Sequence, residues 1–137
     1  MPSELLLDTG ALVSLLDRSQ KRYREFAEFF AAWTGQVATT EAVLTESTHL
    51  LDRVPGGAIA CLDFVLSGGA VLVPTSTAAL RRGRQLMQQY ADCPMDFADA
   101  TLVVLAEELG TDLVLTTDRR DFSVYRIGGR KRFSIPV

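Results

Sequence analysis

The sequence is poor in the side chains on which many enzymes depend. Among its 137 residues it has one histidine, His49, and two cysteines, Cys61 and Cys93, which lie far apart. Structural and catalytic zinc sites use histidine and cysteine at short spacings, so a zinc centre of that kind is nearly excluded. A Ser-His-Asp hydrolase would need His49 as its base, and two isolated cysteines do not make a disulfide framework.

Long hydrophobic runs are also missing. The apolar stretch at residues 5–7 is interrupted at once by Asp8, and it is far shorter than a signal-peptide core or a membrane span. The chain contains no internal repeat, low-complexity tract or linker, and 47% of its residues are hydrophobic, enough for one sizeable core. We therefore expect a single domain over residues 1–137, in the cytoplasm and without a membrane partner.

The charge of the chain is unevenly distributed. The net charge is −3, which argues against a general nucleic-acid binder. However, six of the fourteen basic residues fall within residues 119–132, where only Asp121 opposes them. Acidic residues dominate elsewhere, so the pattern indicates an acidic site beside a basic rim.

Short apolar runs alternate with helical patterns along the chain. Strands are expected at residues 5–7, 36–39, 69–74 and 113–117, with edge strands at 125–127 and 133–135. Helices are expected at residues 11–16, 20–33, 41–51, 58–66, 76–90 and 95–109, the last ended by Gly110. Because the main strands are apolar throughout, the pattern predicts an α/β fold with a mostly parallel sheet covered by helices on both faces.

The tripeptide Asp8-Thr9-Gly10 has three different interpretations. Aspartic proteases carry Asp-Thr-Gly at their catalytic loop, but they are almost entirely β, whereas this motif is followed by a helical pattern and then by several more. In a metal-dependent nuclease, Asp8 would instead lie at the end of the first strand. A third possibility is that Asp8 or Thr9 only caps the helix that follows.

Acidic residues occur at positions where their side chains are expected to meet. Asp8 and Asp118 directly follow strands, and ligands bind at the carboxyl ends of strands in open parallel sheets. Asp96 and Asp99 share one face at the start of an apolar helix, although the helix dipole alone would favour them there. Glu46 falls inside the apolar arc of its helix, where an ion pair with a buried arginine is the other explanation.

An all-oxygen cluster of this kind suits Mg²⁺ or Mn²⁺ rather than zinc. Buried carboxylates without partners are costly, and a bound cation offsets that cost. Such a site lowers the pKa of a bound water and stabilises charge on a phosphate, which indicates a phosphodiester substrate. The basic segment after Asp118 would then hold neighbouring phosphates.

These motifs together resemble a known family. The order is an apolar strand ending in Asp8, Thr-Glu-Ala-Val-Leu-Thr-Glu-Ser containing Glu46, Met-Asp-Phe-Ala-Asp-Ala-Thr-Leu containing Asp96 and Asp99, and Leu-Thr-Thr-Asp-Arg-Arg-Asp-Phe containing Asp118. This order and spacing is similar to that of the PIN domains, in particular the VapC-type ribonuclease toxins of toxin–antitoxin pairs. The resemblance covers essentially the whole chain.

The resemblance implies a fold, a site and partners. The fold would be a three-layer α/β/α sandwich, and the activity an Mg²⁺- or Mn²⁺-dependent endoribonuclease acting on RNA, often tRNA or rRNA. A cognate antitoxin and a homodimer are implied as partners. The catalytic, metal-binding quartet would be Asp8, Glu46, Asp99 and Asp118, with Asp96 as a further acid of the metal site, Thr9 and Thr116 lining it, and Asp121 either joining it or only capping or pairing with a neighbouring arginine.

Two other functions stay open at this point. A PIN-like module could bind RNA or a protein without cutting, which would follow if the acids failed to converge. A phosphatase-like hydrolase could use Asp8 as a nucleophile, but that chemistry usually needs a second aspartate two residues later, where this chain has Gly10.

Overall fold

A four-stranded parallel sheet forms the centre of the molecule. The computed structural model describes residues 4–137. The strands are β1 (Glu4–Leu7), β2 (Gln36–Thr40), β3 (Val71–Val73) and β4 (Leu113–Leu115), in the order β3-β2-β1-β4. All three pairings are parallel, and Leu6 of β1 lies between Ala38 and Val114. The carboxyl ends of β1 and β4 therefore meet at one edge of the sheet.

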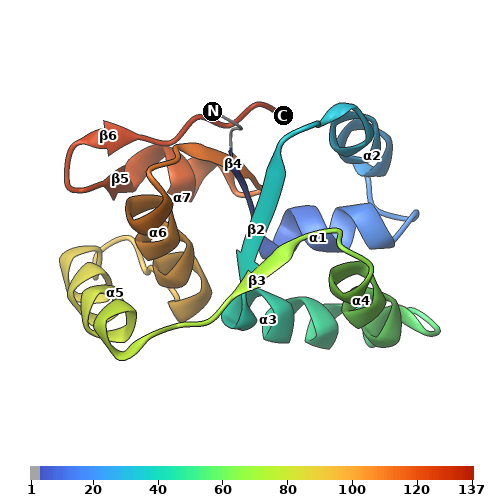
Figure 1. Cartoon of the computed structure of the whole chain (residues 1–137), viewed down its shortest axis with the longest axis horizontal. Coiled ribbons are helices and arrows are strands. Elements are labelled where there is room, and N and C mark those ends of the chain that lie inside the picture. Colours follow the sequence, from blue (N-terminus) through green and yellow to red (C-terminus); the bar gives the residue numbers. More distant parts are fainter. Residues whose placement is uncertain (1–3) are drawn as a thin grey trace.

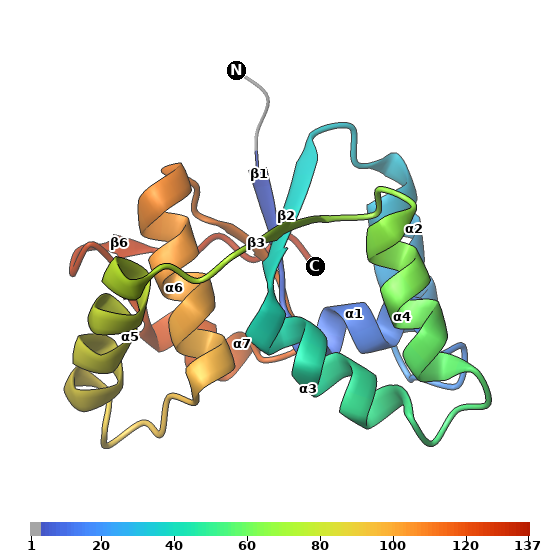
Figure 2. The same cartoon turned by 60° about the horizontal axis from the view of Figure 1, so that its bottom comes forward.

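Helices cover both faces of this sheet, as the sequence predicts. They are α1 (Thr9–Leu16), α2 (Tyr23–Ala32), α3 (Glu41–Leu51), α4 (Gly57–Leu66), α5 (Thr77–Gln89), α6 (Phe97–Leu109) and α7 (Arg119–Val124). Figures 1 and 2 show α5, α6 and α7 on one side of the sheet and α1, α2 and α4 on the other, with α3 starting from the end of β2. The result is a three-layer α/β/α sandwich.

The strands are apolar throughout because both of their faces are buried. Leu6 points into the core formed with α6, whereas Leu5 and Leu7 point into the core formed with α1 and α2. None of these three leucine side chains is exposed to solvent. A side-chain period of two thus divides one leucine run between two cores.

Helix α6 contains the longest unbroken buried stretch among the helices of residues 4–137. All residues from Ala100 to Ala106 are buried, and Gly110 ends the helix in the left-handed conformation with φ of 68°. The hydroxyl groups of Thr40, at the end of β2, and Thr101 form a buried hydrogen bond of 2.8 Å. This bond fixes the first turns of α6 beside the carboxyl edge of the sheet.

The segment after β4 differs from the prediction. A short helix, α7, follows Asp118, and β5 (Arg126–Ile127) pairs antiparallel with β6 (Lys131–Arg132) as a separate ribbon. The predicted strand at 133–135 is wrong, because Ser134 forms only an isolated parallel bridge with Leu113, while Phe133 packs against Phe122. A helix as short as α7 shows no amphipathic periodicity in its sequence.

The helix predicted at residues 20–33 starts later, at Tyr23, because Asp17 organises the turn before it. Its carboxylate accepts hydrogen bonds from the backbone and side chain of Ser19 and from the side chain of Gln20. In the described part of the chain, no helix is long and apolar enough to cross a membrane.

Candidate metal centre

Asp8 and Thr116 lie together at the edge where β1 and β4 end. Leu7 pairs with Leu115, so the residues that follow them are neighbours. The Thr116 hydroxyl donates a hydrogen bond of 2.6 Å to Oδ2 of Asp8, and the Asp8 amide donates to the Leu115 carbonyl. Asp8 is only 5% exposed. Although it precedes α1, its side chain makes no capping bond, so it is free to face the site.

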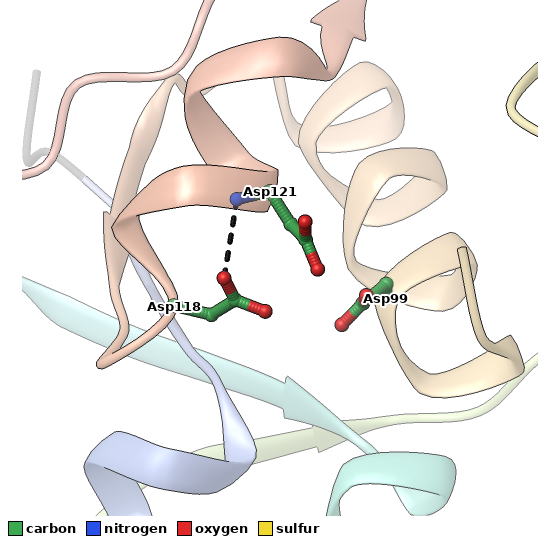
Figure 3. A group of neighbouring side chains, drawn as sticks. All are labelled: Asp99, Asp118 and Asp121. Carbon is green, nitrogen blue, oxygen red and sulfur yellow. Dashed lines mark hydrogen bonds between the residues drawn. The ribbon is translucent and has the colours of Figure 1, made fainter. Parts of the chain in front are cut away.

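Three carboxylates converge next to this pair. Asp99, on the first turn of α6, faces Asp118 and Asp121 of α7, and one oxygen of each lies within 4.8 Å of the others (Figure 3). The Asp118 amide donates to the Thr116 hydroxyl, and Oδ1 of Asp118 accepts from the Asp121 amide at 3.1 Å. Asp118 therefore caps α7, and the same bond brings Asp121 to the cluster.

Glu46 and Asp96 lie at the margin of the acidic region. Both line an open cavity of about 630 Å³ between α3 and the start of α6. Asp96 caps α6 by accepting a hydrogen bond of 2.8 Å from the Asp99 amide. Within residues 4–137, no ion pair engages Glu46, so the buried-arginine explanation is not supported. The buried face of α3 is also narrower than the predicted apolar arc, because Leu50, which belongs to that arc, is 43% exposed.

The predicted quartet is thus brought to one region but not into one tight group. Asp99 and Asp118 belong to the three-carboxylate group, in which the third member is Asp121. Asp8 and Glu46 lie near enough to influence one another, since the charge of Glu46 raises the pKa of Asp8.

Burial dominates the electrostatics of Asp8. Desolvation raises its pKa to about 6, while the Thr116 hydroxyl and the Thr9 amide partly favour the charged form. The negative charges of Glu46 and Asp118 add to the increase.

The pKa of Asp99 is raised further, to about 8. Desolvation is the main cause, and the charges of Asp8, Asp96 and Asp118 contribute, against a hydrogen bond from Tyr125 that favours the charged form. The pKa of Asp121 is raised by its interaction with Asp118. Carboxylates that repel one another in this way are typical of sites that hold a cation.

Sequence reasoning missed Tyr125 and did not decide between capping, arginine pairing and a site role for Asp121. The Asp121 carboxylate faces Asp99 and Asp118. The sequence pattern places Tyr125 in an edge strand, whereas in the structure its buried hydroxyl donates a hydrogen bond of 2.8 Å to Oδ2 of Asp99. The positions of both side chains depend on α7, which is too short to be recognised from the sequence pattern. Thr9 is buried at the start of α1, and its hydroxyl has no hydrogen-bond partner within the described residues.

Gly10 allows the loop that carries Asp118 to approach α1. A Cβ atom at Gly10 would overlap the Thr117 hydroxyl and lie 3.1 Å from the Thr117 Cβ. We expect Gly10→Ala to displace this loop and to destabilise the protein by about 1–2 kcal/mol, as overpacking does. Thermal melting and RNA cleavage measure the effect. The control is Gly83→Ala in α5, where the added Cβ would meet only the Ala100 Cβ at an ordinary 3.8 Å. Melting of Gly10→Ala at or above the wild-type temperature would contradict the expectation.

The donor set fits a hard divalent cation. All the candidate ligands are carboxylate oxygens, and ions such as Mg²⁺ and Ca²⁺ bind oxygens at about 2.0–2.6 Å. Oxygens within 4.8 Å of one another can share such an ion. Burial raises the pKa values of Asp8 and Asp99, and the neighbouring carboxylates raise them further, so a bound cation would stabilise the charged form of both groups.

The chain belongs to the PIN domain family. The family model matches residues 5–128, which include the sheet and every acid of the site. Among curated proteins, the chain is similar to ribonuclease VapC26 of Mycobacterium tuberculosis, with 29% identity over 133 residues that make up 96% of this chain and 98% of the relative.

Solved structures show the same fold. The crystal structure of VapC20 from Mycobacterium tuberculosis, described as a toxin that cleaves the sarcin-ricin loop, has a TM-score of 0.79 at 20% identity and covers 85% of this chain and 92% of its own. DNA-bound VapBC from Salmonella typhimurium has a TM-score of 0.67 at 19% identity, with 97% and 98% covered. A toxin–antitoxin complex from Klebsiella pneumoniae has a TM-score of 0.66 at 22% identity, with 88% and 91% covered.

Proposed function

We propose that this protein is a metal-dependent endoribonuclease and the toxin of a toxin–antitoxin pair. The observation that carries the proposal is the convergence of Asp99, Asp118 and Asp121 beside buried Asp8 in a PIN domain. The likeness to ribonuclease VapC26 over nearly the full length of both chains supports RNA as the substrate.

Asp99, Asp118 and Asp121 would hold an Mg²⁺ or Mn²⁺ ion, with Asp8, Glu46 and Asp96 around them. The bound ion supplies a water of lowered pKa and neutralises charge on the scissile phosphate. Asp8 is held rigidly by Thr116, so its carboxylate keeps one orientation in the site. Glu46 and Asp96 border the adjoining cavity, where an RNA strand can approach the cluster.

Exposed cationic side chains of the C-terminal segment would contact RNA phosphates. Arg119 and Arg120 are exposed at the start of α7, one and two residues after Asp118. Arg130 and Arg132 are exposed on the β5–β6 ribbon. Phosphate contacts of this kind position the substrate and contribute most of the salt-dependent affinity.

Partners are proposed by analogy with the relatives. The Klebsiella pneumoniae structure is a toxin–antitoxin complex, and we propose that this chain also binds a cognate antitoxin, which covers its acidic site. We further propose a homodimer that acts in the cytoplasm, on tRNA or rRNA.

The test is cleavage of a pool of tRNA and rRNA by the purified, antitoxin-free protein. We expect discrete fragments with Mg²⁺ or Mn²⁺ and none with EDTA, because the acids need a cation to approach a phosphate. Calorimetric titration with Mn²⁺ should show binding in the absence of RNA. A folded protein that binds RNA tightly, without metal and without cutting it, would instead support the binding-module alternative.

A further inference from the structure

Tyr125 joins a rigid aromatic cluster to the acidic site. Its side chain is fully buried directly after α7. Its ring lies edge-on to both Phe122 and Tyr90, with centroid distances of 5.2 Å in each case. Phe122 in turn contacts Phe133, so the ring of Tyr125 is enclosed by neighbours from α7, the end of α5 and the C-terminal segment. Enclosed aromatic rings of this kind have little rotational freedom.

The hydroxyl at the end of this ring reaches one carboxylate of the cluster. It donates a hydrogen bond of 2.8 Å to Oδ2 of Asp99. Asp99 lies on the first turn of α6, where its side chain is otherwise partly exposed. With Oδ2 engaged, the carboxylate plane is fixed, and Oδ1 is the oxygen that keeps all its lone pairs for a cation.

We propose that Tyr125 is a positioning residue, which orients the Asp99 carboxylate for divalent-cation binding through its hydroxyl group. This inference rests on the proposed function and names the residue that prepares its metal site. Residues that hydrogen-bond a metal-ligating side chain without contacting the metal typically contribute 10–100-fold to metal affinity or activity, because they hold the ligand in the orientation that the ion requires.

The test compares Tyr125→Phe with Tyr90→Phe. Both variants remove a single hydroxyl from the same aromatic cluster and keep both rings, but the Tyr90 hydroxyl accepts from the Arg126 amide rather than contacting an acid. We expect Tyr125→Phe to raise the Mn²⁺ dissociation constant at least roughly tenfold in calorimetry without RNA. The Kd of Tyr90→Phe should stay within about twofold of the wild type, and circular dichroism checks that both variants are folded.

Kinetics provide the second readout. At limiting Mn²⁺, Tyr125→Phe should lose kcat with little change in the KM for RNA, and excess Mn²⁺ should restore kcat, because the ligand is still present and only its orientation is lost. A loss that excess metal does not restore, or an unchanged Mn²⁺ affinity in Tyr125→Phe, overturns the positioning role. A wild-type protein that neither binds Mn²⁺ nor cleaves RNA contradicts the proposed function itself, and is thus distinguishable from failure of this inference alone.

Discussion

Replacing Asp99 by asparagine is expected to lower kcat for RNA cleavage by at least roughly 100-fold, at the upper end of the range for groups that act on a metal only through its ligand. The Asp99 carboxylate lies close to those of Asp118 and Asp121 and accepts the hydrogen bond from Tyr125. It therefore interacts with more residues of the site than a peripheral acid would. An amide has one acceptor oxygen and no charge, so it is a weaker ligand for a divalent cation than the carboxylate. Single-turnover cleavage of a labelled RNA in saturating Mn²⁺ measures the loss.

The fold should survive this substitution. The asparagine oxygen can still accept the Tyr125 hydroxyl, and removal of a charge relieves repulsion from Asp8, Asp96 and Asp118. We therefore expect the metal-free variant to melt at or above the wild-type temperature. The matched control is Asp63→Asn on α4, an exposed acid on the opposite face of the sheet, which should leave cleavage unchanged. A folded Asp99→Asn protein that cuts RNA at the wild-type rate would remove Asp99 from catalysis.

The central part of the fold could be predicted because it follows from local patterns. The fully apolar strands at residues 5–7 and 113–115 require a sheet buried on both faces, and that requirement places Asp8 and Thr116 at one edge. Gly110 marks the end of α6 because only a left-handed residue closes the helix there. These features depend on residues close in sequence or on the handedness of the backbone.

The details of the site could not be predicted in the same way. The sequence cannot show that Asp121 turns toward Asp99, because the two residues belong to different helices and α7 is held by the Asp118 cap. The Tyr125–Asp99 bond joins residues 26 positions apart and depends on packing between three aromatic rings. For Glu46 the sequence pattern predicts too much burial. Glu46 lies within an apolar arc of its helix, but in the structure it borders an open cavity, and the neighbouring Leu50 is exposed.

Asp8→Asn is expected to stabilise the metal-free protein at neutral pH while weakening its response to metal. Asp8 is almost fully buried and its pKa rises from 3.8 to about 6 on folding. The folded state therefore binds more protons than the unfolded state between these pH values, so the wild-type protein loses stability as the pH rises from about 4 to about 6. A shift of this size corresponds to roughly 2–3 kcal/mol above pH 6.

Asparagine removes this penalty and keeps an oxygen to accept the Thr116 hydroxyl. Urea unfolding in EDTA should therefore show Asp8→Asn to be more stable than the wild type at pH 7.5 and nearly equal to it at pH 3, where the aspartate is largely protonated in both states. The control Asp63→Asn should follow the wild type at both pH values. Equal stability of Asp8→Asn and wild type at pH 7.5 would mean that Asp8 carries no folding penalty.

Bound metal should make the wild type more stable than Asp8→Asn, which reverses the order expected without metal. Mn²⁺ binds the folded state alone, so it stabilises the wild type in proportion to the logarithm of its concentration relative to Kd. The gain should be larger at pH 7.5 than at pH 5, because protons compete with the ion for Asp8 and Asp99, whose pKa values lie at about 6 and about 8. Asp8→Asn should gain less at pH 7.5, since one carboxylate near the ion is gone. A cation-binding role for these acids requires that the empty site lowers the stability of the protein and that bound metal restores it. A purely structural cluster would show neither a pH-dependent stabilisation by Mn²⁺ nor the reversed order of stability.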